Sequence, residues 1–518
     1  MLNKCYCATC IGVEAVVVTV EVDLSTGIGI HLVGLPDSAV RESLLRVVTA
    51  LTSYGFHVPG RKLVVNLAPA DIRKEGSAYD LAIAIGMLAV SEQIKPIDSE
   101  RFVIMGELAL DGRIRPVNGV LPVALQARAE GFEGCIFPAE SAQEASEVDG
   151  LAVYGVSTLA EAIEVLTQRE LCDPLRVRRA AGGTEFRPSG NDFRQVRGQQ
   201  LAKRGLEIAA AGGHNIILVG APGSGKSLMA SCLPSILPPM TRDEAIETGK
   251  IYSVAGRGIR NGGLMRERPF RAPHHSASLV SLIGGGPQAG PGEISLAHNG
   301  VLYLDEIAQF SRGLLDALRQ PLEDGRVTIS RAKYKVDYPA HFMLAASMNP
   351  CPCGYYGDDT ARCTCTRGAI EGYLSRISGP LMDRIDLQIW TKSLTANELL
   401  GIADEGEVPS PTQACSAVIA ARVAKARAIQ AVRFAGEGIY VNAAMGARLI
   451  ERHCALSDEC RSTLEKILDR MGLSARAYTR ILKVARTIAD LAGVPDILPA
   501  HLLEAAGFRF LDRRRIVD

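Results

Sequence analysis

The sequence has little that would indicate an extended architecture or a specialised surface. Aromatic residues make up 5% of the 518 residues, which argues against aromatic-rich repeat folds. Lysine plus arginine (57) equal aspartate plus glutamate (57), so net charge does not indicate nucleic acid or a membrane as partner. Any such binding has to use local patches. The longest uncharged apolar run, Leu81–Val90, is far shorter than the ~18 residues that span a bilayer.

The chain also lacks a recognisable secretory signal. Its first ten residues, MLNKCYCATC, are too short and polar to form one. The thirteen cysteines are an odd number, and without a signal they indicate reduced thiols or metal ligands rather than a disulfide framework. We therefore expect a cytoplasmic protein without a membrane segment. Its hydrophobic (47%) and charged (22%) contents are those of a globular protein.

The fold class predicted from the pattern of elements is α/β. Residues 1–172 alternate β-branched runs with stretches of helical apolar spacing. The expected strands are Ala15–Val22, Lys62–Leu67 and Arg101–Leu108, and the expected helices are Asp37–Leu51 and Ser77–Val90.

Three further parts follow. Residues 173–192 are charged and contain glycine and proline, which predicts a linker. Residues 193–395 form a second α/β pattern, and residues 396–518 lack strand signals and predict a helical bundle. In that bundle one helix should end at Gly472, with Ser474 as a cap of the next. The second α/β part has short apolar runs typical of a buried parallel sheet at Ile216–Val219, Val301–Leu304 and Phe342–Ala346.

A phosphate-binding loop is predicted directly after the first of these runs. The sequence GAPGSGKS fits the pattern G-x-x-x-x-G-K-S between a strand and a helix. Glycines let backbone N–H groups surround phosphate oxygens, the lysine reaches the β- and γ-phosphates, and the serine hydroxyl ligates Mg²⁺. The predicted nucleotide-binding residues are Gly220, Ala221, Pro222, Gly223, Ser224, Gly225, Lys226 and Ser227.

Polar residues at the ends of the next two runs favour hydrolysis of the bound nucleotide. Asp305 follows an apolar strand and is predicted to hold Mg²⁺, and Glu306 to polarise the attacking water. Asn349 ends the third run and could orient that water, although an asparagine before proline is also a common turn residue.

Four cysteines lie within fifteen residues. Cys351 and Cys353 form one C-x-C pair, and Cys363 and Cys365 form another. Four thiolates from two turns suit a closed, structural Zn²⁺ site, with a disulfide as the alternative.

The runs GAPGSGKS, RPFRAPHHSAS, GPGEISLAHNGVLYLDEI, SMNPCPCG and LSRISGPLMDRIDL span residues 196 to 390 in order. With them the chain resembles the AAA+ ATPases, and more closely their magnesium-chelatase-like YifB/ComM family. The resemblance implies a homo-oligomeric ring, usually a hexamer, with ATP between subunits. It implies that Arg384 is the arginine finger, with Arg376 as a rival, and that Arg476 is the second sensor arginine. The segment from Val196 to Gln199 would line the adenine.

The first part of the chain is similar to the Lon-type protease domain of ribosomal-S5-like fold. The matching segments begin at Lys74 and at Gly106. Ser77 falls near that family's nucleophile, but Leu121 stands in the segment where the family has its base lysine. Because a serine without a base is a poor nucleophile, we expect a non-catalytic module, comparable to the one in RadA.

A basic hairpin is the main candidate for DNA contact. Residues Arg326–Lys335 alternate as strands do, with four cations and no acid, and Arg331 and Lys333 are the predicted DNA-binding residues. In the AAA+ family this hairpin projects into the ring pore. A second basic segment covers residues 250–275. A solvated cationic surface is the alternative for both segments.

The resulting hypothesis is an ATP- and Mg²⁺-dependent ring motor on single-stranded or branched DNA. The resemblance implies helicase and branch-migration activity of the ComM type. The alternatives are a chelatase-type ATPase that remodels a protein partner, an ATP-dependent protease and a non-enzymatic ATP-gated scaffold.

Overall fold

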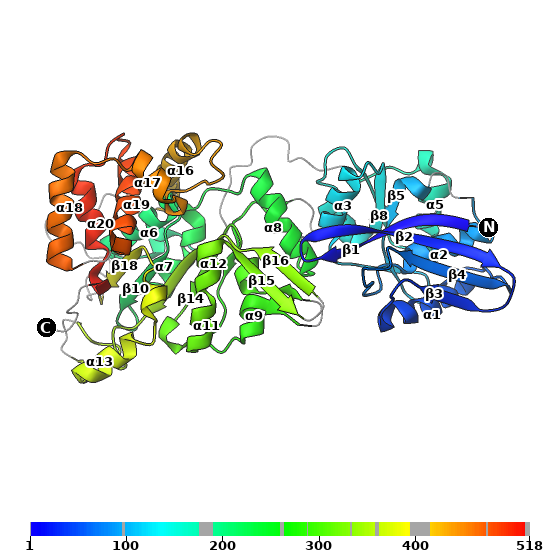
Figure 1. Cartoon of the computed structure of the whole chain (residues 1–518), viewed down its shortest axis with the longest axis horizontal. Coiled ribbons are helices and arrows are strands. Elements are labelled where there is room, and N and C mark those ends of the chain that lie inside the picture. The colour runs from blue at the N-terminus through cyan, green and yellow to red at the C-terminus, as the bar shows by residue number, and fades with distance from the viewer. Residues whose placement is uncertain are drawn as a thin grey trace.

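A computed structural model describes residues 2–95, 99–175, 190–258, 264–286, 289–331, 334–357, 362–393, 415–472 and 475–512. The chain forms a row, with the N-terminal sheet at one end, a second sheet in the middle and the C-terminal helices at the other end (Figure 1). Most of the predicted linker, as well as Lys333 and Ser474, lies outside these ranges. No helix in the described ranges is both long and apolar enough to cross a membrane.

The N-terminal part is a mixed seven-stranded sheet covered by helices. Its order is β3-β4-β2-β1-β5-β8-β9, with antiparallel pairing around β2 and parallel pairing from β1 to β9 and between β3 and β4. The strands are β1 Leu2–Ile11, β2 Glu14–Ser25, β3 Ile30–Val33, β4 Lys62–Ala68, β5 Phe102–Ile104, β8 Gly134–Pro138 and β9 Ala152–Val156. The helices are α1 Ser38–Ser53, α2 Asp80–Val90, α3 Val120–Ala129, α4 Ala139–Ala145 and α5 Leu159–Thr167.

The structure refines what the sequence indicates for two segments of the N-terminal part, residues 81–90 and 101–108. The apolar run from Leu81 to Val90 is helix α2, which is buried along its whole length, so its hydrophobicity reflects the core. The single strand expected over residues 101–108 is instead two strands, β5 and β6 (Glu107–Leu108), interrupted at Gly106. Strand β6 leaves the large sheet and pairs with β7 (Ile114–Arg115).

The middle part is built on an all-parallel five-stranded sheet of order β11-β14-β17-β10-β18. Parallel strands place their carboxyl ends at one edge, which is where ligands bind in such sheets. The strands are β10 Ile216–Gly220, β11 Phe270–Arg271, β14 Val301–Leu304, β17 Met343–Met348 and β18 Leu387–Thr391. The three predicted apolar runs are thus β10, β14 and β17, whereas β11 and β18 had no sequence signal strong enough to be predicted.

Short helices and one hairpin surround this sheet. The hairpin is antiparallel and consists of β15 (Arg326–Arg331) and β16 (Tyr334–Pro339). The helices are α6 Gln200–Gly212, α7 Lys226–Ser231, α8 Arg242–Val254, α9 Leu279–Ile283, α10 Glu293–Leu296, α11 Arg312–Ala317, α12 Arg319–Asp324, α13 Arg367–Leu374 and α14 Gly379–Met382.

The C-terminal part is helical in the described residues 415–472 and 475–512, as predicted. Its helices are α16 Ser416–Arg433, α17 Ala447–His453, α18 Asp458–Met471, α19 Ala475–Ala492 and α20 Pro499–Gly507. Helix α18 ends at Gly472, which has a left-handed backbone (φ +59°). Apolar side chains of these helices and of β10, β17 and β18 share one buried cluster, so the helices pack directly on the sheet.

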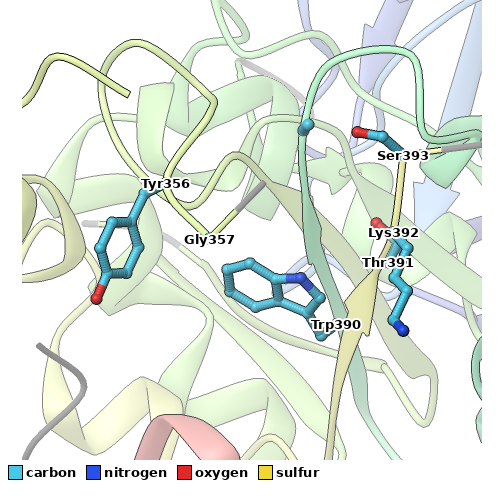
Figure 2. A pocket seen from close by; sticks show the side chains of 7 residues that line it. Tyr356, Gly357, Trp390, Thr391, Lys392 and Ser393 are labelled. Atoms are coloured by element: carbon cyan, nitrogen blue, oxygen red, sulfur yellow. The ribbon is translucent and has the colours of Figure 1, made fainter. Parts of the chain in front are cut away.

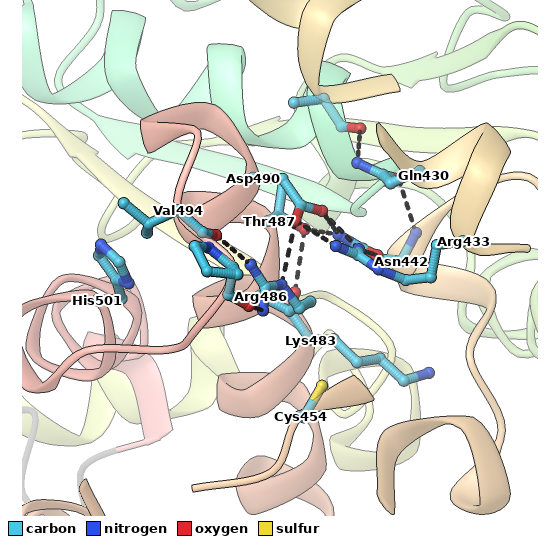
Figure 3. Close-up of polar contacts among 12 residues, drawn as sticks. Gln430, Arg433, Asn442, Cys454, Lys483, Arg486, Thr487, Asp490, Val494 and His501 are labelled. Atoms are coloured by element: carbon cyan, nitrogen blue, oxygen red, sulfur yellow. Dashed lines mark hydrogen bonds and ion pairs between the residues drawn. The ribbon is translucent and has the colours of Figure 1, made fainter. Parts of the chain in front are cut away.

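A buried ionic network stabilises the helical part. Figure 3 shows Arg433, Arg486 and Asn442 converging on the Asp490 carboxylate. The distances to its oxygens are 2.7 Å from Arg433 Nη1, 3.1 Å from Arg486 Nε and 2.8 Å from Asn442 Nδ2. Because a buried charge is costly unless it is paired, losing one partner would destabilise the bundle strongly.

The N-terminal part docks on the middle part through α8 and the hairpin. Val13, at the tip of the β1–β2 turn, belongs to the buried cluster of the middle part together with Val336 and Tyr338. Lys250 of α8 forms an ion pair with Glu14 at 3.1 Å. The two parts therefore share apolar and ionic contacts.

Candidate nucleotide site

The predicted phosphate loop lies between β10 and α7, as its sequence indicates. The Lys226 amine donates to the backbone carbonyls of Gly220 (2.7 Å) and Ala221 (2.9 Å), and to Asn349 Oδ1 (3.4 Å). Burial lowers the pKa of Lys226, although Asp305 and Glu306 act in the opposite direction. The lysine thus lies at the carboxyl edge of the sheet, where the predicted residues of two other strands reach it.

Asp305 follows β14 and is surrounded by hydroxyl groups. Ser227 donates to its Oδ2 at 2.9 Å, Tyr303 donates to its Oδ1 at 2.9 Å, and Ser347 also donates to Oδ1. Burial alone would raise the pKa of Asp305, but these hydrogen bonds outweigh it and lower the pKa. The carboxylate is therefore ionised at neutral pH and lies beside the loop serine.

Glu306 is held in an unusual backbone conformation. Its φ is +50°, in the left-handed region that non-glycine residues rarely adopt. The Glu306 N–H donates to Ser347 Oγ at 3.1 Å, and the side chain accepts a hydrogen bond from Gln309. Strain of this kind is concentrated at functional sites, where the surrounding structure maintains it.

The segment predicted to line the adenine lies beside the same loop. Gln199 donates to the carbonyls of Lys392 (2.6 Å) and Ser224 (3.2 Å), and Val196 is buried in the core. Ser224 in turn shares a hydrogen bond of 2.9 Å with Thr391 at the end of β18. Gln199 therefore joins its own segment to the phosphate loop and to β18.

A small cavity of about 50 Å³ opens at this edge of the sheet. Figure 2 shows Tyr356 and Gly357 on one side of Trp390, and Thr391, Lys392 and Ser393 on the other. Ala221 of the phosphate loop completes the lining. The cavity thus joins the phosphate loop, β18 and the segment that follows Asn349.

The three predicted arginines have partners other than Lys226 within the chain. Arg384 donates to the Pro380 carbonyl at 2.7 Å and forms an ion pair with Glu323. Arg476 pairs with Asp383 at 2.7 Å, directly beside Arg384 in the sequence.

The rival finger, Arg376, lies over the Tyr373 ring, 5.7 Å from its centroid. It also makes a long contact of 3.5 Å with the Ala308 carbonyl.

The four clustered cysteines come together, as predicted for a metal site. Their sulfur atoms all lie within 4.8 Å of one another. The Sγ–Sγ distances are 3.3 Å for Cys351–Cys353, 3.8 Å for Cys351–Cys363 and 3.7 Å for Cys353–Cys363. All thirteen cysteines of the chain have free thiols, so the alternative of a disulfide is not found here.

The residues of the Lon-like motif form no dyad with each other. Ser77 donates its hydroxyl hydrogen to Glu107, and the Lys74 amine donates to the Pro69 carbonyl. Leu121 is buried and packs against α8, where a side chain added at Gly249 would lie 2.9 Å from it.

Of the predicted DNA-binding residues, Arg331 ends strand β15. Lys333 lies outside the described residues.

Several residues of the site were not found from the sequence. Tyr303 and Ser347 bind Asp305, Thr391 binds the phosphate loop, and Glu323 pairs with Arg384. Tyr303 and Ser347 had a usable signal, because each lies at a predicted strand two residues before Asp305 or Asn349, and side chains two apart share one face of a strand. Thr391 and Glu323 make contacts between segments that are distant in the sequence.

Similarity to known proteins extends over most of the chain. Three family descriptions match: "Magnesium chelatase, subunit ChlI" over residues 192–399, "Subunit ChlI of Mg-chelatase" over residues 20–141, and "Magnesium chelatase, subunit ChlI C-terminal" over residues 413–509. A shorter similarity joins the chain to Lon protease 2 of Bacillus subtilis, with 28% identity over 128 residues, 24% of this chain and 23% of that protein.

Two relatives match over nearly their full lengths. Competence protein ComM of Haemophilus influenzae is 45% identical over 98% of this chain and 97% of its own length. YifB of Escherichia coli is 41% identical over 97% of this chain and 96% of its own length. Identity at this level over both whole lengths shows that the chain belongs to the YifB/ComM family of magnesium-chelatase-like proteins.

Proposed function

We propose that this protein is an ATP-hydrolysing AAA+ ring motor that acts on DNA. The observation that carries the proposal is the meeting of Lys226, Ser227, Asp305 and Asn349 at the carboxyl edge of one parallel sheet. Family membership supports the coarser part of it, an ATPase of the ComM and YifB type that uses ATP and Mg²⁺.

The residues at this edge fit a magnesium nucleotide. Lys226 and the glycine-rich loop would hold the phosphates, while Ser227 and the ionised Asp305, 2.9 Å apart, would hold Mg²⁺. Bound Mg²⁺ would neutralise charge on the phosphate oxygens. Val196 and Gln199 would border the adenine.

Glu306 is assigned the role of polarising the attacking water, and Asn349 that of orienting it. Arg384 and Arg476 are assigned to the site of a neighbouring subunit. Within one chain Arg384 pairs with Glu323, and Arg476 pairs with Asp383 of the LMDRIDL segment. Completing the site from a neighbour requires a homo-oligomer, and we propose a hexameric ring.

We assign the four parts of the chain accordingly. Residues 1–172 are a non-catalytic Lon-like domain of S5 fold, residues 173–192 a linker, residues 193–395 the AAA+ core, and residues 396–518 a helical lid. The Lys74 amine donates to the Pro69 carbonyl and Ser77 donates to Glu107, so these two residues form no Ser–Lys pair, which supports the absence of Lon-type peptidase activity.

DNA is the proposed substrate, through phosphate contacts of Arg331 and Lys333 on the β15–β16 hairpin. The proposed activity is ComM-like helicase and branch migration on single-stranded or branched DNA in the recombination of incoming DNA, and similarity to a relative named a competence protein is what supports a DNA-related role. We also assign a structural Zn²⁺ to the four clustered cysteines, and a cytoplasmic location.

The alternative is a chelatase-type ATPase that remodels a protein partner. It is favoured by the match of three chelatase subunit descriptions to the chain. The two functions share the nucleotide site and differ in what stimulates it.

ATP turnover measured with and without single-stranded, duplex and four-way-junction DNA tests the proposal. Lys226→Ala should lose nucleotide binding, whereas Glu306→Gln should bind ATP and hydrolyse it about 100-fold more slowly or worse. Wild-type turnover in Glu306→Gln would remove the assigned role of Glu306. Turnover that no DNA changes at low salt would favour the protein-remodelling alternative.

A further inference from the structure

The segment Cys351–Gly357 connects the cysteine cluster with the nucleotide site. It begins two residues after Asn349, whose side chain contacts Lys226. The N–H of Tyr356 donates to the Cys351 sulfur at 3.3 Å. The same Tyr356, with Gly357, lines the cavity beside the phosphate loop (Figure 2). One short segment therefore carries two of the four thiols at one end and a wall of the pocket at the other.

The segment packs closely against the phosphate loop and strand β18. A Cβ atom added at Gly354 would lie 2.8 Å from Pro222 in the phosphate loop, and one at Gly357 would lie 2.6 Å from the Trp390 ring. Both glycines have positive φ, +89° and +73°. The backbone thus lies directly against the phosphate loop and against β18, in a conformation that needs glycine at both positions.

The geometry of the four sulfurs fits one tetrahedral ion. With Zn–S bonds of about 2.3 Å, the edges of a tetrahedron of sulfurs are about 3.8 Å long. Among Cys351, Cys353 and Cys363 the Sγ–Sγ distances are 3.8, 3.7 and 3.3 Å, and the Cys365 sulfur lies within 4.8 Å of each of the other three. All four donors are thiols, the ligands that soft metal ions prefer. Four thiolates would fill every position of a tetrahedral ion and leave none open for a substrate. The cluster is suited to a closed structural site.

We propose that zinc bound by Cys351, Cys353, Cys363 and Cys365 fixes the 351–357 segment against Pro222 and Trp390, and thereby sets the affinity of the site for nucleotide. This inference rests on the proposed function, since it takes the Gly220–Ser227 loop as the nucleotide site. Ion binding contributes folding energy to the segments that supply its ligands. Without the ion, Tyr356 and Gly357 would lose their anchor at Cys351, and the wall of the pocket would no longer be held in place.

The test uses the full-length protein purified without chelator, and two readouts: zinc per chain, and affinity for a fluorescent ATP analogue in the presence of Mg²⁺. Wild type should hold about one zinc per chain. The double variant Cys363→Ser with Cys365→Ser should lose the zinc and bind the analogue at least about tenfold more weakly. Cys172→Ser, in the N-terminal part, is the matched control and should change neither readout.

A second variant changes the pocket lining at Gly357 without removing a cysteine, so the test also works if loss of zinc unfolds the protein. Gly357→Ala should retain zinc and still weaken nucleotide binding, because the added methyl group would collide with Trp390. Treatment with a chelator should lower the affinity of wild type, and Zn²⁺ but not extra Mg²⁺ should restore it. A folded, zinc-free double variant that binds the analogue as wild type does would overturn the inference.

The outcome is separable from that of the proposed function. If zinc-loaded wild type binds no nucleotide, or Lys226→Ala binds as tightly as wild type, the nucleotide site itself is misassigned and the inference fails with it. If Lys226→Ala abolishes binding while loss of zinc does not alter it, only the link between zinc and nucleotide is wrong.

Discussion

Asp305 and Glu306 are adjacent carboxylates with different surroundings. Three hydroxyl groups donate to Asp305, which lowers its pKa and leaves it a stable anion suited to a metal ligand. Glu306 has a left-handed backbone, and its carboxylate accepts a hydrogen bond from Gln309. These different surroundings agree with the roles proposed above, Asp305 as a metal ligand and Glu306 as the residue that polarises water.

The proposed role of Arg384 can be tested by removing its guanidinium group. Arg384→Ala should bind nucleotide nearly as wild type does and lose hydrolysis by about 1000-fold or more, the effect of removing an arginine finger. If the residue acts on a neighbour's site, as proposed, adding the variant to wild type should lower turnover by more than its share of subunits. ATP turnover and nucleotide affinity are the measurements.

The matched control is Glu323→Gln, which removes the ion-pair partner within the chain and leaves the guanidinium in place. It should retain hydrolysis. Unchanged turnover in Arg384→Ala would transfer the finger role to Arg376.

How far single residues were predictable depended on whether their partners are close in the sequence. Lys226 and Ser227 belong to one contiguous pattern, and Asp305 and Asn349 stand at the ends of recognisable strands. Thr391 and Glu323 contact the site across 167 and 61 positions of sequence, so only the folded sheet reveals them.

The turn between β1 and β2 and the helix α8 form the main contact between the N-terminal and middle parts. A side chain added at Gly12 would lie 2.4 Å from Val336 of the hairpin, and Gly12 itself has a φ of +65°. Leu121, in the segment where a Lon-type base would stand, packs against Gly249 of α8. The hydrophobic replacement thus has a packing role between the two parts.

Glu144 gives this contact a pH dependence. It lies on α4, accepts a hydrogen bond of 2.6 Å from Ser253 of α8, and has its pKa raised by burial from 4.5 to about 7. Below pH 4.5 the carboxyl is protonated in both folded and unfolded chains. Between pH 4.5 and 7 the unfolded chain ionises first, so stability falls as the pH rises, by up to roughly 3 kcal/mol.

Glu144→Gln keeps the shape of the side chain and removes its titration. The melting temperature of the variant should therefore fall less than that of wild type between pH 5 and 7.5. Glu140→Gln, exposed on the same helix, is the control and should follow wild type. A variant and wild type with parallel pH profiles would contradict the assignment.

Elements with a strong apolar pattern were predicted well, and those defined by tertiary contacts were not. The runs at β10 and β14 match the structure, and the one at β17 does so within two residues. Strand β11 has two residues and exists only because it pairs with β14. The 101–108 segment divides at Gly106, whose backbone N–H donates to the Ala78 carbonyl (2.9 Å) and whose carbonyl accepts from the Leu81 N–H (3.1 Å), both outside the large sheet.

At the scale of the whole molecule, the LMDRIDL segment is tied to the C-terminal helices on both sides of Arg384. Asp383 pairs with Arg476 and the buried Asp386 with Arg480, both on α19 and both at 2.7 Å. Asp386 also contacts His214, at the end of α6. Movement of the helical part would therefore act directly on the arginine assigned to the neighbouring site.

The distribution of charge over the whole molecule determines how it could bind DNA. With 57 positive and 57 negative residues the chain has no net charge to attract a polyanion, so binding has to come from a concentrated group of cations. The β15–β16 hairpin is one such group, and its base is held by the Gly12–Val13 turn.

Replacing both Arg331 and Lys333 by alanine tests this assignment. If each contacts a phosphate, DNA affinity should fall for every sequence alike, and the slope of log affinity against log salt should shrink by about two. Basal ATP turnover should persist, because neither residue belongs to the nucleotide site, while stimulation by DNA should be lost. Binding isotherms at several salt concentrations, with turnover measured in parallel, provide both quantities.

A matched control removes two exposed arginines elsewhere, Arg448 and Arg452, which share Glu437 as their ion-pair partner on the helical part. That variant also loses two positive charges, so it separates local phosphate contacts from general electrostatic attraction. If both double variants shift the salt slope equally, the cations act through the overall field. If neither differs from wild type, the hairpin does not contact DNA, and the protein-remodelling alternative becomes the better account of the motor.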